Sequence, residues 1–228
     1  MIIAIHQPNY LPWCGYFHKM LSCDLFVILD DVGFSKRAIT NKNKIKSPDG
    51  PRVLSVPLEN KNGQIKDVTT LNDGNWPQKH WGSIQRSYTR ASFWKLYQHL
   101  FRPIYENPDE KLADLNIRLI EVIRTELGIT TPIIRSSEIQ GVTGHKGEKI
   151  INICKALSAT VYLSGIGAKT YNDEKEFEKN QIHLVYQEFE PPVYQQLWGD
   201  FIPNLSAIDL LFNCGPKSKD FIPKQVIV

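Results

Sequence analysis

The chain has 228 residues, of which 42% are hydrophobic and 22% are charged, so it can bury a core without disulfides. A formal net charge of +3 from scattered basic residues argues against a dedicated nucleic-acid binder, and no apolar run reaches the roughly 20 residues of a membrane span. The four cysteines are too sparse for a disulfide framework and lack the spacing of metal ligands, so we expect reduced thiols and no metal site.

The N-terminal residues predict a strand, a helix and a second strand. Residues 2–5 and 25–29 are short apolar runs, typical of parallel strands that are covered on both faces, and residues 15–23 between them suit a helix. No basic segment precedes the first run, which therefore indicates a strand rather than a signal peptide. These features predict a cytoplasmic protein.

The next segment predicts an excursion from the sheet. Short β-like pieces at 53–56 and 68–70 are separated by turn signals, of which Asn62-Gly63 is the best candidate for a hairpin turn. Apolar side chains then recur at helical spacing up to residue 127. The aromatic residues within this helical stretch suit either a helical core or a homodimer interface.

Strands and helices alternate again after residue 127. The expected elements are a strand at 132–134, a helix at 147–157, and strands at 159–163 and 182–186. This alternation predicts an α/β fold with a mainly parallel sheet flanked by helices. We expect one α/β domain over residues 1–228, with a β-hairpin and helical insertion at 47–127.

A first group of polar and aromatic side chains follows the first predicted strand. Its members are His6, Gln7, Asn9, Tyr10, Trp13 and His18. Ligands of open α/β sheets bind at the carboxyl ends of the strands, so the group predicts a small-molecule site. His6 suits a general base, the amides can form directional hydrogen bonds, and the aromatic rings can stack on a base or sugar. The alternatives are a Pro-rich turn with aromatic packing and, for His18, a structural role in the helix.

A second polar group follows the second predicted strand. It contains Asp30, Asp31, Lys36, Arg37, Asn41 and Asn43. Two carboxylates followed by basic residues can hold a metal, a phosphate or each other, and adjacent aspartates alone do not make a metal site. A solvated charged loop is the alternative interpretation.

A third group follows the strand that ends at Leu163. Its members are Ser164, Gly165, Gly167, Lys169 and Tyr171, and Tyr194 and Gln196 add a phenol and an amide further along the chain. Glycines let the backbone approach an anion, so this segment is a candidate for holding phosphate. It lacks the third glycine of the dinucleotide fingerprint and the spacing of a P-loop. The sequence also has no zinc-protease or serine-hydrolase motif.

Several motifs together resemble the WbqC-like family over nearly the whole chain. They are His6-Gln-Pro-Asn-Tyr10, Leu11-Pro-Trp-Cys-Gly-Tyr-Phe-His-Lys19, Asn41-Lys-Asn-Lys-Ile-Lys46, Tyr162-Leu-Ser-Gly-Ile-Gly-Ala168 and Leu205-Ser-Ala-Ile-Asp-Leu-Leu-Phe-Asn213. The family is associated with bacterial gene clusters for O-antigen (the outer part of lipopolysaccharide) and other surface polysaccharides. Such clusters make nucleotide-linked amino sugars whose amines are often acylated or aminoacylated.

The resemblance therefore implies an amide-forming N-acyl or aminoacyl transferase that acts on a nucleotide-linked amino sugar. In this hypothesis His6 deprotonates the sugar ammonium and Asp31 orients or shares that proton. Lys36, Arg37 and the loop from Ser164 to Lys169 hold phosphates, while Tyr10 and Trp13 stack on the base or sugar. The acyl or amino-acid donor stays open, as does the use of ATP.

The first strand, loop and helix also look like those of the nucleotidylyltransferase and pantothenate-synthetase type of three-layer fold. In place of the H-x-G-H motif of that fold, this chain has Trp13-Cys14-Gly15-Tyr16, which keeps the glycine and lacks both histidines. The substitution puts ATP-dependent adenylylation in doubt and leaves the fold analogy intact. The alternative functions are an adenylate-forming or nucleotidyl-transferring enzyme and a non-catalytic module that binds a sugar nucleotide.

Overall fold

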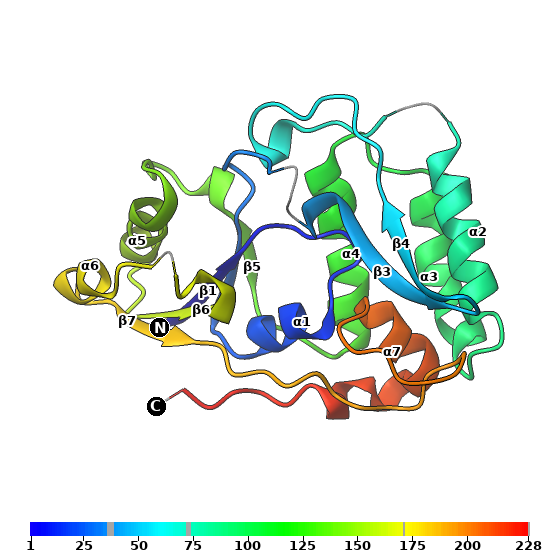
Figure 1. Ribbon diagram of the computed structural model, residues 1–228. Coiled ribbons are helices and arrows are strands. Elements are labelled where there is room, and N and C mark those ends of the chain that lie inside the picture. Colours follow the sequence, from blue (N-terminus) through cyan, green and yellow to red (C-terminus); the bar gives the residue numbers. More distant parts are fainter. Residues whose placement is uncertain (36–38, 72–73, 171, 228) are drawn as a thin grey trace.

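The computed structural model describes residues 1–35, 39–71, 74–170 and 172–227. Its centre is a sheet of five strands, all paired in parallel (Figure 1). In sheet order they are β5 (Ile133–Arg135), β2 (Leu25–Ile28), β1 (Ile2–His6), β6 (Val161–Ser164) and β7 (His183–Tyr186). The mainly parallel α/β sheet predicted from the sequence is confirmed.

The strand order places a topological switch point between β1 and β6. From β1 the chain moves outward to β2 and β5, then returns to the other side of β1 for β6 and β7. The loops after β1 and β6 therefore leave the sheet toward opposite sides, and their divergence opens a crevice at the carboxyl ends of these two strands.

Seven α-helices accompany the sheet in the residues that the structure describes. They are α1 (Cys14–Leu21), α2 (Trp76–Tyr88), α3 (Trp94–Glu106), α4 (Leu112–Glu126), α5 (Lys146–Ala156), α6 (Glu174–Lys179) and α7 (Ala207–Cys214). Helices α5 and α6 lie on one side of the sheet, and α1, α4 and α7 lie on the other, with α2 and α3 beyond them (Figure 1). The arrangement is a three-layer α/β fold.

Two separate cores hold the three layers together, because side chains alternate between the faces of each strand. On β1, Ile3 and Ile5 join the core beneath α5 and α6, whereas Ala4 joins the larger core beneath α1, α4 and α7. On β2, Val27 belongs to the first core and Phe26 to the second. Both faces of these strands are buried, so nearly every residue in them must be apolar.

The hairpin differs from its prediction. It consists of β3 (Lys42–Ser47) and β4 (Gly50–Ser55), and its turn lies at residues 48–49 rather than at Asn62-Gly63. Gly50 follows the turn with a φ of +99°, which a residue without Cβ adopts readily. Residues 68–70 form only isolated bridges to other segments. The sequence did not predict the strand at 42–47 because most of its residues are polar. Lys46 in this strand is nevertheless buried, and its ammonium is paired by hydrogen bonds.

The aromatic residues of the helical segment pack among themselves. Trp81 stacks on Trp94 with ring centroids 5.4 Å apart, and on Tyr105 at 5.9 Å. Phe101 contacts Phe212 of α7 at 5.7 Å between centroids. This packing accounts for these aromatic residues within one chain. Of the helices in the described parts of the chain, none is both long enough and apolar enough to cross a membrane.

Candidate functional site

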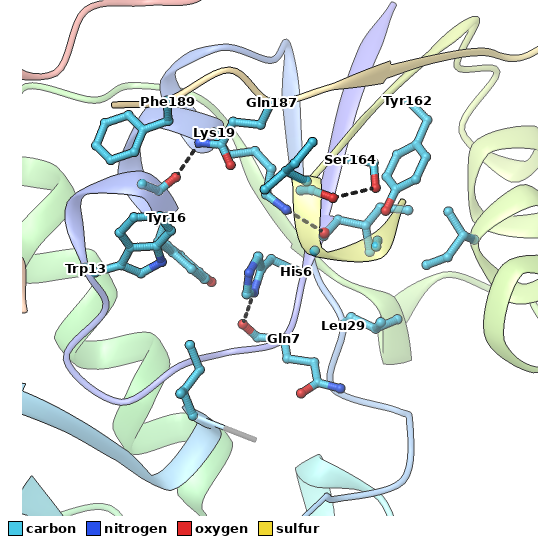
Figure 2. A pocket seen from close by; sticks show the side chains of 18 residues that line it. His6, Gln7, Trp13, Tyr16, Lys19, Leu29, Tyr162, Ser164, Gln187 and Phe189 are labelled. Atoms are coloured by element: carbon cyan, nitrogen blue, oxygen red, sulfur yellow. Dashed lines mark hydrogen bonds between the residues drawn. The ribbon is translucent and has the colours of Figure 1, made fainter. Parts of the chain in front are cut away.

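A cavity of about 420 Å³ opens at the switch point between β1 and β6 (Figure 2). The end of β1, one face of α1, the loop after β6 and the segment after β7 enclose it. The polar and aromatic side chains in its wall are His6, Gln7, Trp13, Tyr16, Lys19, Tyr162, Ser164, Gln187 and Phe189. The sequence-predicted groups after β1 and β6 thus contribute to the same cavity.

His6, the last residue of β1, presents an unprotonated ring nitrogen. Its Nδ1 lies 3.0 Å from the carbonyl oxygen of Gln7, and since that oxygen can only accept, Nδ1 carries the proton. Nε2 is therefore the basic nitrogen of the neutral ring. Burial, together with the nearby positive charge of Lys19, lowers the pKa of His6 to about 3. His6 is neutral at physiological pH.

One face of α1 lines the cavity. Lys19 shares this face with Gly15 and Tyr16, because it follows them by four and three residues. Lys19 is only 3% exposed and donates a hydrogen bond of 3.3 Å to the Ile5 carbonyl. Among the residues that the structure describes, no carboxylate pairs with it. Burial lowers the pKa of Lys19 to about 8.

Trp13 forms an aromatic wall of the cavity. It packs edge-on against Phe189 with ring centroids 5.4 Å apart. A Cβ atom at Gly15 would lie 2.4 Å from the Trp13 ring, so a side chain at position 15 would displace the indole. The glycine is therefore required for the position of the aromatic wall.

A family model described as the WbqC-like protein family matches residues 7–221. The chain belongs to this family. The protein named "Uncharacterized protein Rv1507c" of Mycobacterium tuberculosis is 36% identical over 224 residues, which cover 96% of each chain. No solved structure matches. The resemblance inferred from the motifs is confirmed.

In this WbqC-like protein the loop after β6 lies beside Lys19. A Cβ at Gly165 would lie 3.6 Å from Lys19 Nζ, and Gly167 also lines the cavity. Ser164 lines it too and accepts a hydrogen bond of 3.0 Å from Asn172. Lys169 lies outside this wall, with its ammonium 5.6 Å from the centroid of the Tyr186 ring. Tyr171 lies outside the described residues.

His18 lies beside the cavity rather than in its wall. The amide nitrogen of Gln187 is 2.8 Å from His18 Nδ1 and 2.7 Å from the carbonyl oxygen of Gly15. Because an amide nitrogen only donates, His18 Nδ1 is the acceptor. His18 thus helps to fasten the segment after β7 to α1, and burial lowers its pKa.

Asp31 belongs to a different cluster. Its carboxylate is 2.6 Å from Lys149 Nζ and accepts a hydrogen bond from Ser136. The neighbouring Asp30 is fully buried and pairs with Arg135 at 2.6 Å. These contacts tie the end of β2 to β5 and α5, and neither aspartate lines the cavity. Lys36 and Arg37 lie outside the described residues.

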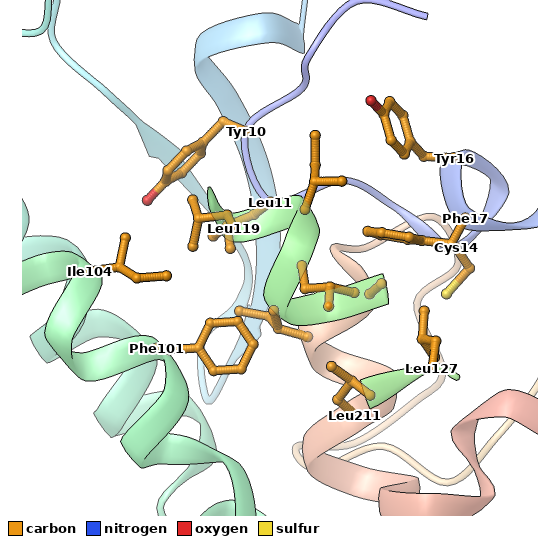
Figure 3. Packing of buried hydrophobic residues seen from close by; sticks show 14 of the residues in the cluster. Tyr10, Leu11, Cys14, Tyr16, Phe17, Phe101, Ile104, Leu119, Leu127 and Leu211 are labelled. Carbon is orange, nitrogen blue, oxygen red and sulfur yellow. The ribbon is translucent and has the colours of Figure 1, made fainter. Parts of the chain in front are cut away.

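The structure corrects the stacking role assigned to Tyr10. Its side chain is 0% exposed within the larger core (Figure 3) and does not line the cavity, so it offers no face to a ligand there. The hydroxyl lies 2.8 Å from His80 Nδ1 and 2.8 Å from Tyr105 Oη. These partners are 70 and 95 residues away in sequence, so local sequence could not reveal them.

The predicted amides are divided between the cavity and the scaffold. Gln7 lines the cavity, and its oxygen accepts a hydrogen bond of 3.2 Å from Thr40. Asn9 is 2% exposed and does not line it. Asn41 and Asn43 donate to the carbonyls of Val56 and Leu11 at 3.0 and 2.6 Å, and so fix the hairpin in place.

Tyr194 and Gln196 belong to a second buried polar group, which we call the anchoring cluster. Its members are Lys46, Tyr88, Tyr194, Gln196 and Asp209. The hydroxyls of Tyr88 and Tyr194 each donate to the Asp209 carboxylate at 2.8 Å. Lys46 Nζ donates to Gln196 at 3.1 Å and to the carbonyls of Gly199 and Asp200. The cluster fastens the loop before α7 to the hairpin.

Sequence reasoning did not single out Lys19 or Phe189 for the site, whereas Gln187 was among the downstream amides that it considered. A lysine in a short helix usually extends into solvent, so the residue type alone does not indicate that Lys19 is buried. The helical spacing of Gly15, Tyr16 and Lys19 is the signal that could have found it, because it places the ammonium on the same face as the glycine that supports Trp13.

Proposed function

We propose that the switch-point cavity binds a nucleotide-linked amino sugar, and that the protein transfers an acyl or aminoacyl group to its amine in the synthesis of a bacterial surface polysaccharide such as O-antigen. The observation that carries the proposal is the unprotonated Nε2 of His6 within this cavity. The motif resemblance supports the choice of pathway, because the WbqC-like family is associated with gene clusters for surface polysaccharides. The cavity volume of about 420 Å³ lies within the range of small-molecule sites.

His6 acts as the proton carrier of the reaction. The sugar amine attacks the carbonyl carbon of an activated ester or thioester donor, and a C–N bond forms while the carbonyl becomes a tetrahedral oxyanion. His6 Nε2 takes the proton that the amine loses. When the intermediate collapses, the bond to the leaving group breaks, and the His6 imidazolium returns that proton to the departing oxygen or sulfur. The products are an amide and a free alcohol or thiol. Where ATP has first activated an amino acid as an aminoacyl adenylate, the leaving group is AMP and His6 releases the proton to solvent.

An anionic substrate makes His6 a stronger base. In the free protein, burial and the charge of Lys19 hold the pKa of His6 near 3, where a histidine takes up protons poorly. A negative group bound between the two residues would offset the field of Lys19 and raise the pKa of His6. Binding of the phosphate-bearing substrate therefore prepares the base for its step.

The remaining assignments divide by position. Trp13 is the ring available for stacking on the base or sugar. Ser164, Gly165 and Gly167 line the side where phosphates would approach. Asp31 has no part in the proton transfer proposed here, because it is paired with Lys149.

The test is a product assay by mass spectrometry. Purified protein is incubated with nucleotide-linked amino sugars and one donor class at a time: acyl-CoA, aminoacyl-tRNA, or an amino acid with ATP. We expect an amide product with one donor class, and a loss of turnover of about 10²–10⁴-fold in His6→Asn. Asparagine retains a donor toward the Gln7 carbonyl but removes the basic nitrogen. His99→Asn, on the exposed surface of α3, is the matched control and keeps full turnover.

Two outcomes would contradict the proposal. Nucleotidyl transfer that requires ATP, without amide formation, would instead indicate the adenylate-forming class. Tight binding of the sugar nucleotide with no product from any donor would indicate a non-catalytic binding module.

A further inference from the structure

The cavity contains two buried polar groups that the fold itself leaves incompletely paired. Tyr16 is 1% exposed, and its hydroxyl has no hydrogen-bond partner among the described residues. Lys19 is 3% exposed, and its ammonium has one contact in the part of the chain described, a long bond to the Ile5 carbonyl. An ammonium has three protons to donate, and burying a polar group without partners is unfavourable.

The two groups face the same space. Figure 2 shows the Tyr16 hydroxyl and the Lys19 ammonium near the His6 ring, on different sides of it, and all three residues line the cavity. The His6 ring centroid lies 4.8 Å from that of Tyr16. No aspartate or glutamate lines this cavity in the described residues. Its floor therefore offers a positive charge and a hydroxyl donor, without a negative group to compete for them.

We propose that the Lys19 ammonium and the Tyr16 hydroxyl form an oxyanion subsite, which binds a phosphoryl or carboxylate group of the substrate. The inference rests on the proposed function, because it takes the same cavity as the substrate site. It adds that an anionic group of the substrate lies at the cavity floor. Both groups are donors at neutral pH, since burial raises the pKa of Tyr16 well above its ordinary value and so keeps its proton in place.

The other buried lysines show what a structural lysine looks like in this fold. Lys149 forms an ion pair of 2.6 Å with Asp31, and Lys46 donates to three oxygen atoms of the loop before α7. Lys19 has no comparable partner among the described residues. A bound oxyanion would supply the missing charge and accept from Tyr16 in the same step.

The subsite also connects to the proposed chemistry. An oxyanion between Lys19 and His6 would cancel the repulsion that keeps His6 from taking up a proton. Lys19 thus acts on the base through the bound group. We therefore regard Lys19 and Tyr16 as substrate-binding residues.

The experiment measures binding of simple probes by calorimetry at pH 7, with pyrophosphate and acetate as separate arms. We expect Lys19→Met to lower the affinity of the bound probe by about 10–100-fold, and Tyr16→Phe by about 5–10-fold. Lys95→Met and Tyr88→Phe are matched controls away from the cavity and keep the wild-type affinity. The arm that binds identifies the group as phosphoryl or carboxylate.

A second readout separates binding from folding. If the two groups serve a ligand, Lys19→Met and Tyr16→Phe keep or raise the melting temperature while they lower affinity. Three results would overturn the proposal. They are equal affinity in wild type and Lys19→Met, no binding of either probe to the wild type, and a lower melting temperature in both variants. Because binding requires no turnover, these results stand apart from the product assay: the subsite can hold where acyl transfer fails, and acyl transfer can hold where the subsite fails.

Discussion

Two buried clusters of this protein each combine a lysine with tyrosine, and they differ in how their polar groups are paired. In the anchoring cluster, the hydroxyls of Tyr88 and Tyr194 both donate to Asp209, and Lys46 has three acceptors. In the cavity, the Tyr16 hydroxyl lacks a partner among the described residues and Lys19 has a single long contact. Paired groups of this kind stabilise a fold, whereas unpaired ones cost stability and are retained where a ligand completes them.

The largest difference is expected between the two lysines. Lys46→Met removes the donor from three oxygen atoms and the nearby positive charge from Asp209, so the free energy of unfolding should fall by about 3–5 kcal/mol. Lys19→Met removes a buried charge that has no carboxylate partner among the described residues, so the free energy of unfolding should stay the same or rise. Urea denaturation of both variants measures the contrast. Equal destabilisation by the two substitutions would contradict it.

A smaller difference is expected between two tyrosines. Tyr88→Phe leaves the Asp209 carboxylate with one hydroxyl donor fewer, and should lower the free energy of unfolding by about 1–3 kcal/mol. Tyr16→Phe removes a hydroxyl without a partner among the described residues, and should change it by less than about 0.5 kcal/mol. Thermal and urea denaturation of Tyr88→Phe and Tyr16→Phe at the same pH measures this difference in stability. A larger loss in Tyr16→Phe than in Tyr88→Phe would show that the Tyr16 hydroxyl has a structural partner.

The fold was largely predictable from the sequence, because buried parallel strands must be apolar on both faces. Residues 2–5 and 25–29 carry that signal, and the alternation of strands with helices predicts a parallel sheet. The hairpin turn was misplaced because the polar strand at 42–47 is stabilised by distant partners. Lys46, for example, meets Gln196, 150 residues away.

The candidate site was predictable only in part. His6, Gln7, Trp13 and the glycines after β6 line one cavity, and the sequence could group them because the carboxyl ends of neighbouring parallel strands meet at one edge of the sheet. Tyr10 was misassigned, since an amphipathic phenol serves equally well in a core or in a site. Lys19 was missed because burial of a lysine depends on the elements packed around it, here the loop after β6.

The central claim is that a bound anion pairs with the buried Lys19 ammonium. The most direct test of this claim is the titration of Lys19 itself. Among the ionisable groups around it, burial holds the pKa of His6 near 3 and raises those of Cys23 and Tyr162 to about 12, and Tyr16 also stays protonated. Lys19 is therefore the group of this set that changes charge near pH 8.

The measurement follows the ¹³Cε resonance of Lys19 against pH with and without the probe that binds, the signal being assigned by its loss in Lys19→Met. We predict a pKa of about 8 in the free protein, because burial disfavours the ammonium, and a higher pKa with pyrophosphate or acetate bound, because an anion favours it. By linkage, affinity for the anion should then fall as the pH rises above about 8. A Lys19 that titrates at the ordinary lysine value and does not respond to either probe would contradict the account.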